Sequence, residues 1–305
     1  MHVEHLSLTH FRNYARLELS LPASQPVVLH GANAQGKTSL LEAIFYLATS
    51  RSPYTLSDRQ LIHWRAEEEV IPFARLAADL RTGRGGLERL EMVLVLERAG
   101  DGGQRFKKTI RLNGAEKRVM DVVGLMAVVL FLPQDLSLVE GPPGDRRRFV
   151  DGTLAQVDRD YFQALAIYEK ILPQRNALLK RIAEKQASPS ELPYWDDQLV
   201  TAGSVLISGR QRFLRELEVS AQTAHLELTG RRELLTIQYQ PSFAPTAEAD
   251  GQLSFSALGL DLHRDLSPEQ IAPQFADRLD AEPVSYTHLR AHETPEHLVC
   301  RLLLE

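Results

Sequence analysis

A short run containing two glycines, a lysine and a threonine is the feature that most constrains how this chain folds. Residues 31–38 read GANAQGKT, which fits the spacing GxxxxGK(S/T). The preceding run PVVLH (26–30) is typical of a short buried strand, and KTSLLEAIFYLA (37–48) repeats apolar residues at helical spacing. The order strand, glycine loop, helix predicts an α/β fold.

This run has the chemistry of a phosphate-binding loop. Glycine lets backbone N–H groups turn toward an anion, and the positive end of the following helix points at the same place. Lys37 would reach the β- and γ-phosphates of a nucleotide, and Thr38 would hold Mg²⁺ through its hydroxyl. The alternative, a glycine-rich turn before an ordinary helix, is disfavoured by the flanking strand and helix patterns. Candidate ATP contacts are Gly31, Ala32, Asn33, Ala34, Gln35, Gly36, Lys37, Thr38 and Ser39.

Composition sets broad limits on the function. The chain has 305 residues, 44% of them hydrophobic, and no run that matches a signal peptide or a membrane span. Its only cysteine, Cys300, excludes an internal disulfide framework, so we expect a soluble cytoplasmic protein without membrane association. The net charge of -5 neither supports nor excludes DNA binding, which would require a local basic face.

The rest of the chain predicts a sheet followed by helices. Strand-like runs broken by glycine turns predict an antiparallel meander between about 70 and 120, and LMAVVLFL (125–132) is typical of a buried strand. Helical periodicity over 154–225, interrupted by EKQASPSELP (184–193), predicts an antiparallel helix hairpin. A strand is expected over 233–243, and then a helix start at Ser267 interrupted by Pro273.

The last stretch continues none of these patterns. It holds three of the ten histidines and the only cysteine, and we interpret 283–305 as a non-native tail. A metal site could be assembled there from His288, His292, His297 and Cys300. Pro295 would break the helix before the later ligands, which argues against that site.

Four separated motifs resemble the RecF family of bacterial recombination mediators. They are LTHFRNYARLEL (8–19), GANAQGKTSLLEAIFYLATSRSPYT (31–55), FLPQDLSLVEGPPGDRRRFVDGTL (131–154) and YEKILPQRNALLK (168–180). The resemblance runs from residue 1 to about 282. It implies an SMC-like ABC-type P-loop ATPase head, with a mixed sheet plus a meander, and a helical second lobe. The lobes would be 1–150 and 151–282, with 283–305 as the foreign tail.

The resemblance also implies a function. Members bind ATP and Mg²⁺, dimerise around two nucleotides and bind single-stranded, gapped or junction DNA. With RecO and RecR they help load the RecA recombinase in repair, replication and the SOS response, and their ATPase activity is weak and DNA-stimulated. By motif, Arg12 would lie near the phosphates and Gln134 would sense the γ-phosphate and Mg²⁺, although many relatives have an acidic residue at the latter position.

Outside the loop, each basic residue has an alternative interpretation. Arg12 could be a solvated arginine beside a strand. The run Arg146, Arg147 and Arg148 could contact DNA phosphates, or form a solvated face paired with Asp145 and Asp151. We expect Lys107, Lys108 and Arg111 on the outer face of a strand.

Hydrolysis requires elements that the sequence does not display. No apolar strand ends in paired acids: MVLVLE ends in Glu97, and Pro133 separates VVLFL from Asp135. LISGRQRF (206–213) imitates an ABC signature but lies inside a helical pattern. The family's C-terminal third, which would supply both, would begin where the tail starts. We therefore expect a truncated chain with uncovered apolar surface and little hydrolysis on its own.

Two other functions remain open at this stage. A different P-loop phosphotransferase would need its own acceptor pocket and acidic base, and no such set is evident. A non-catalytic interaction module would use nucleotide only to stabilise the fold while the helix hairpin binds a partner.

Overall fold

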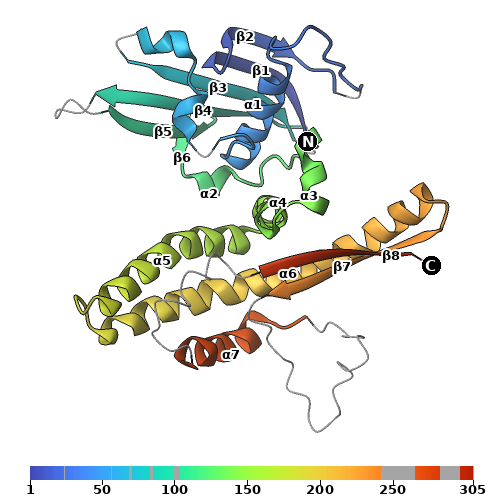
Figure 1. Ribbon diagram of the computed structural model, residues 1–305. Coiled ribbons are helices and arrows are strands. Elements are labelled where there is room, and N and C mark those ends of the chain that lie inside the picture. Colours follow the sequence, from blue (N-terminus) through green and yellow to red (C-terminus); the bar gives the residue numbers. More distant parts are fainter. Residues whose placement is uncertain are drawn as a thin grey trace. The chain divides into compact units, whose positions relative to one another are not determined.

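The structure is a computed structural model whose residues fall into two compact units, Met1–Phe131 and Leu132–Glu305, each taken by itself below (Figure 1). It describes residues 1–23, 25–55, 57–68, 71–82, 85–98, 104–241, 265–281 and 296–304. No helix among these residues is long and apolar enough to cross a membrane.

The first unit is built on a six-stranded sheet with the order β2-β1-β3-β4-β5-β6, in which every pair is antiparallel. The β5–β6 turn uses Asn113 and Gly114 at φ 52° and 83°, the left-handed pair that a tight hairpin requires. The predicted meander is confirmed. The strands are β1 (His2–Phe11), β2 (Tyr14–Ser20), β3 (Phe73–Arg81), β4 (Leu87–Arg98), β5 (Gln104–Leu112) and β6 (Ala115–Lys117).

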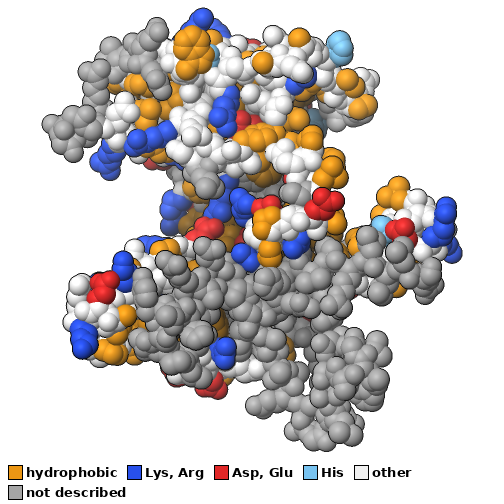
Figure 2. Space-filling view, viewed as in Figure 1, with side chains coloured by type: hydrophobic (Ala, Val, Ile, Leu, Met, Phe, Trp, Pro, Cys, Tyr) orange, Lys and Arg blue, Asp and Glu red, His pale blue; other side chains and the backbone are white. Residues whose placement is uncertain are grey.

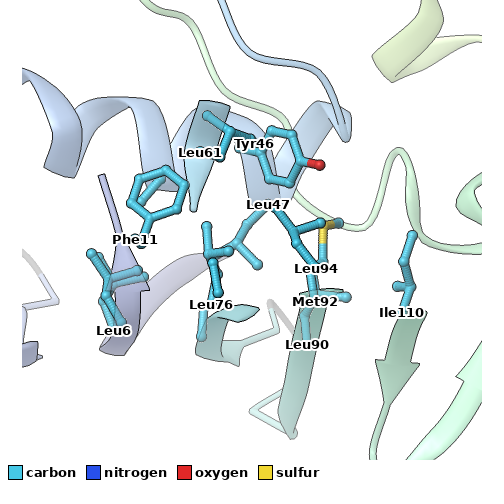
Figure 3. Packing of buried hydrophobic residues seen from close by; sticks show 14 of the residues in the cluster. Leu6, Phe11, Tyr46, Leu47, Leu61, Leu76, Leu90, Met92, Leu94 and Ile110 are labelled. Carbon is cyan, nitrogen blue, oxygen red and sulfur yellow. The ribbon is translucent and has the colours of Figure 1, made fainter. Parts of the chain in front are cut away.

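The helix α1 (Lys37–Thr49) packs on one face of this sheet, over β3 and β4. Its apolar residues and the inward side chains of the strands form one core, seen from close by in Figure 3. Burial of each large aliphatic or aromatic side chain contributes about 1.5–3 kcal/mol. The residues labelled there are Leu6, Phe11, Tyr46, Leu47, Leu61, Leu76, Leu90, Met92, Leu94 and Ile110. Three short helices, η1 (Asp58–Leu61), η2 (Trp64–Glu68) and α2 (Val119–Val122), complete the unit.

Two segments predicted as buried strands are not strands in the structure. Residues 26–30 and 125–132 belong to no strand or sheet, and the exposed fractions of Val28 and Val129 are 86% and 94%. Apolar composition signals a buried strand only where a neighbouring strand supplies backbone partners, and neither segment has a ladder partner among the described residues. The prediction was therefore wrong for these residues, which leave apolar side chains uncovered.

The second unit is mainly helical, and its α5–α6 pair confirms the predicted hairpin. The short helix η4 (Pro189–Glu191) lies in the turn, and Arg175 on α5 donates through Nε to Asp196 Oδ1 on α6 at 2.5 Å. The other elements are η3 (Pro133–Leu136), α3 (Ser137–Glu140), α4 (Pro143–Val157), α5 (Arg159–Ala183), α6 (Leu192–Leu228), β7 (Glu233–Pro241), α7 (Pro268–Ala281) and β8 (Glu296–Leu304).

The end of the chain differs from the sequence prediction in two respects. Helix α7 continues through Pro273, which lies inside the helix, where an interruption was expected. Residues 296–304 pair antiparallel with β7. His288 and His292 of the alternative metal site lie outside the described residues.

Candidate nucleotide-binding site

The loop 31–36 contains backbone conformations that residues with a Cβ adopt only at a cost. Gly31, Ala34 and Gly36 have φ of 154°, 64° and 97°. A Cβ on Gly36 would lie 2.8 Å from Tyr14 Cζ and 2.9 Å from the side-chain amide of Asn13, so only glycine fits. The sequence spacing thus has a local steric cause.

Lys37 places its ammonium group across this loop. Nζ donates to the Gly31 carbonyl at 2.8 Å and to the Ala32 carbonyl at 2.7 Å. Residues 31–35 are exposed, so a polyanion can reach the ammonium and compete with these carbonyls for it.

Helix α1 presents its positive end to the same loop. Its first turn has no acidic residue, and the Leu40 N–H donates to the Gly36 carbonyl at 2.9 Å. The Thr38 hydroxyl stands at that end, with Ser39 next to it. The arrangement gives an anion a helix N-terminus, an ammonium group and a hydroxyl within one turn of chain.

The turn between β1 and β2 supports the loop from one side. Asn13 Nδ2 donates to the Ala34 carbonyl and the Tyr14 hydroxyl donates to the Gly36 carbonyl, both at 3.2 Å. Burial raises the pKa of Tyr14, which keeps its hydroxyl a donor. Sequence reasoning missed both contacts, although the two residues are the last letters of the motif FRNY.

The comparisons with known proteins agree with this geometry. A family model described as an AAA domain matches residues 5–122, which include the loop. The DNA replication and repair protein RecF of Chloroflexus aurantiacus is 48% identical over 251 residues, covering 79% of this chain and 63% of that protein. RecF of Thermomicrobium roseum is 39% identical over 285 residues, covering 89% of this chain and 71% of the relative. The chain belongs to the RecF family.

A solved structure confirms the α/β fold class of this RecF-family chain. The recombination mediator protein RecF-ATPrS of the RecFOR pathway has a TM-score of 0.77 at 24% identity, over 99% of this chain and 73% of that one. The chain spans just under two-thirds of the length of the Chloroflexus relatives, 63% and 62%.

Arg12, expected near the phosphates, is bound to a carboxylate. Its Nε and Nη2 donate to the two oxygens of Glu42 on α1, at 2.8 and 2.6 Å, and Nη1 donates to the Gln60 carbonyl at 3.0 Å. It is therefore not the solvated arginine of the alternative interpretation. A phosphate contact by Arg12 stays a prediction.

One of the three basic residues expected on the outer face of a strand lies on the inner face. Lys108 shares the core side of β5 with Ile110, and its Nζ donates to the Ser50 carbonyl at 2.8 Å and to Asp58 at 3.0 Å. Burial lowers its pKa, against the attraction of Asp58. The ammonium group binds the carbonyl of Ser50, the residue that caps the C-terminus of α1, where a positive charge is favourable. Lys107 and Arg111 are exposed, as predicted.

In the second unit, the three consecutive arginines lie on α4, and Arg146 and Arg148 contact neighbouring residues of α3 and α4. Arg146 Nη1 donates to the carbonyls of Leu138, Val139 and Gly141 at 2.9, 3.3 and 3.0 Å, and so ties α3 to α4. Arg148 is exposed and bonds to Asp145. Gln134 is exposed on η3. A role for any of them in binding DNA or sensing nucleotide stays a prediction.

The run LISGRQRF (206–213), which imitates an ABC signature, has a packing role inside α6. A Cβ on Gly209 would lie 2.7 Å from the ring of Tyr161, so glycine admits that ring. Arg210 is buried and donates through Nε and Nη2 to the two oxygens of Asp151 on α4, each at 2.9 Å. The run therefore joins α4, α5 and α6.

Proposed function

We propose that this RecF-family chain binds ATP at the loop 31–38. The observation that carries the proposal is the Lys37 ammonium group seated on the carbonyls of a loop whose backbone only glycine permits at residue 36. Family membership supports it, and so do the solved RecF structures with a nucleotide in their names.

The residues present also fit Mg²⁺, but only as a partner of the phosphates. No cluster of three or more acidic, histidine or cysteine ligands exists within the described part of the chain. Magnesium commonly takes one or two protein oxygens and fills its other positions with phosphate and water. The Thr38 hydroxyl would supply that single ligand, and the ion would neutralise charge on the phosphates.

The proposed biological role is recombination mediation in the bacterial cytoplasm. The relatives are named DNA replication and repair proteins, and the solved structures are named for the RecFOR pathway. We propose that an ATP-dependent homodimer binds single-stranded, gapped or junction DNA and helps RecO and RecR load RecA, also in the SOS response. Because Glu97 is paired with Arg105 within the β4–β5 ladder, we propose that it does not position water and that the chain hydrolyses little ATP alone.

Arg148 is a more favourable candidate for a DNA contact than Arg146. The side chain of Arg148 is 72% exposed, whereas Arg146 already donates hydrogen bonds to three backbone carbonyls. Figure 2 shows acidic and basic side chains intermixed at the tip of the α5–α6 hairpin, where Lys180 pairs with Glu184 at 4.0 Å. Lys180 therefore has a negative neighbour, which is unfavourable for contact with a phosphate backbone.

Titration calorimetry with ATP and magnesium tests the nucleotide proposal. Lys37→Ala removes a charge-assisted contact to phosphate and should raise the Kd by about tenfold to a hundredfold. Lys107→Ala, an exposed lysine of β5, is the matched control and should leave the Kd unchanged. Absence of heat with the unaltered chain would refute the proposal. Phosphate transfer to a small acceptor would favour the phosphotransferase, and partner binding insensitive to Lys37→Ala would favour the interaction module.

A further inference from the structure

Glu42 is a buried carboxylate on the phosphate-loop helix that the proposed nucleotide chemistry leaves without a role. Its exposed fraction is 2%, and it lies four residues after Thr38, about one helical turn from the loop on the same face of α1. A negative charge so close to a site for a polyanion repels the ligand, so it needs a role that offsets this repulsion.

The carboxylate joins three other segments to α1. It accepts the two hydrogen bonds from Arg12, and a third from the Ser52 hydroxyl at 2.5 Å. Arg12 in turn donates to η1 through its backbone N–H to the Leu61 carbonyl at 2.8 Å and through Nη1 to Gln60. Three of the five N–H groups of the guanidinium take part in these contacts.

The ion pair fixes a strained turn. Arg12 has φ of 53°, a left-handed conformation that a residue other than glycine adopts at a cost. The next two residues, Asn13 and Tyr14, are the ones that hold the Ala34 and Gly36 carbonyls of the loop. The path from Glu42 to the phosphate loop is therefore short and made of hydrogen bonds.

We propose that Glu42 is a positioning residue for nucleotide binding: by holding Arg12, it keeps the turn 12–14 against the phosphate loop. This inference rests on the proposed ATP site. It predicts that removing the charge of Glu42 weakens ATP binding, whereas Coulomb repulsion alone predicts tighter binding. Removing a negative charge near a polyanion should tighten binding by Coulomb attraction alone, whereas removing the brace should weaken it.

A double-mutant cycle on the full chain measures the effect. Glu42→Gln cannot accept both guanidinium bonds, and Arg12→Gln removes the donor. Each should raise the Kd for ATP with magnesium about tenfold, which is about 1.4 kcal/mol and of the size expected for ordering a single loop residue. The double variant should be no weaker than either single variant, because both act through one contact.

Glu91→Gln is the matched control. Glu91 accepts from Arg75 Nε at 2.5 Å and is partly buried, but strand alternation places it on the face of the sheet opposite to Leu90 and Met92. It should lower the Tm and leave the Kd unchanged. A merely structural role of Glu42 would likewise lower the Tm and the binding stoichiometry without changing the Kd.

The outcomes of these measurements distinguish the role of Glu42 from the existence of the ATP site. ATP binding that Glu42→Gln leaves unchanged or tightens would overturn the role of Glu42 and leave the ATP site standing. Absence of ATP binding by the unaltered chain would instead overturn the proposed function. If Glu42→Gln does not fold, the double variant Glu42→Gln with Arg12→Gln, which removes both charges, is measured instead. A Kd for ATP with magnesium equal to that of the unaltered chain would then refute the inference.

Discussion

Gly36→Ala is the sharpest test of the loop geometry. The left-handed φ of 97° costs a residue with a Cβ about 1–2 kcal/mol. The new Cβ would lie at 2.8 and 2.9 Å from the side chains of Tyr14 and Asn13, far inside the 3.5–4.0 Å of an ordinary carbon contact, so these side chains must move away. Their two hydrogen bonds to the loop are then lost, at about 0.5–1.5 kcal/mol each.

Together these terms reach about 2–5 kcal/mol and act on the loop conformation that binds phosphate. We expect the Kd for ATP with magnesium to rise by at least about thirtyfold, measured by calorimetry, with little change in the Tm of the second unit. Gly152→Ala on α4 is the control: nothing lies within 4 Å of its Cβ, and alanine should stabilise the helix by about 0.5–1 kcal/mol. A Gly36→Ala chain that binds ATP as the unaltered chain does would refute the steric argument.

Three further predictions concern stability. Asp151→Asn leaves the buried Arg210 without its counterion and should cost about 3–5 kcal/mol in urea unfolding; a loss below about 1 kcal/mol would contradict the buried pair. Lys108→Met removes the donor to Asp58 of η1 and to the Ser50 carbonyl at the end of α1, and should cost about 1–3 kcal/mol, with unchanged stability as the contrary result. Burial raises the pKa of Tyr161, so its contribution to stability is present below the unfolded pKa of about 10 and is lost as the pH rises beyond it. Tyr161→Phe should therefore flatten the alkaline decline of the unfolding free energy, and an unchanged slope would count against that burial.

Local features of the sequence predicted the phosphate loop, and tertiary contacts decided the rest. The spacing and the helical periodicity after it predicted a glycine loop followed by the helix that begins at Lys37, because these features depend on neighbours in the chain. The run 26–30 failed as a strand because pairing depends on residues far away in sequence. Lys108 was misplaced because the amphiphilic run RFKKTIRL gives no indication that a lysine caps α1.

The residues that sequence reasoning missed act across long separations. Glu42 lies 30 positions from Arg12, and Asn13 lies 21 positions from Ala34, so no periodicity joins either pair. Asn13 and Tyr14 hold the carbonyls of two positive-φ residues of the loop, Ala34 and Gly36. A loop that is already ordered loses less conformational entropy when it closes on phosphate, and more of the contact energy remains as affinity. The strength of ATP binding should therefore depend on side chains that need not touch ATP, with Glu42 the most distant of them along the path to the loop.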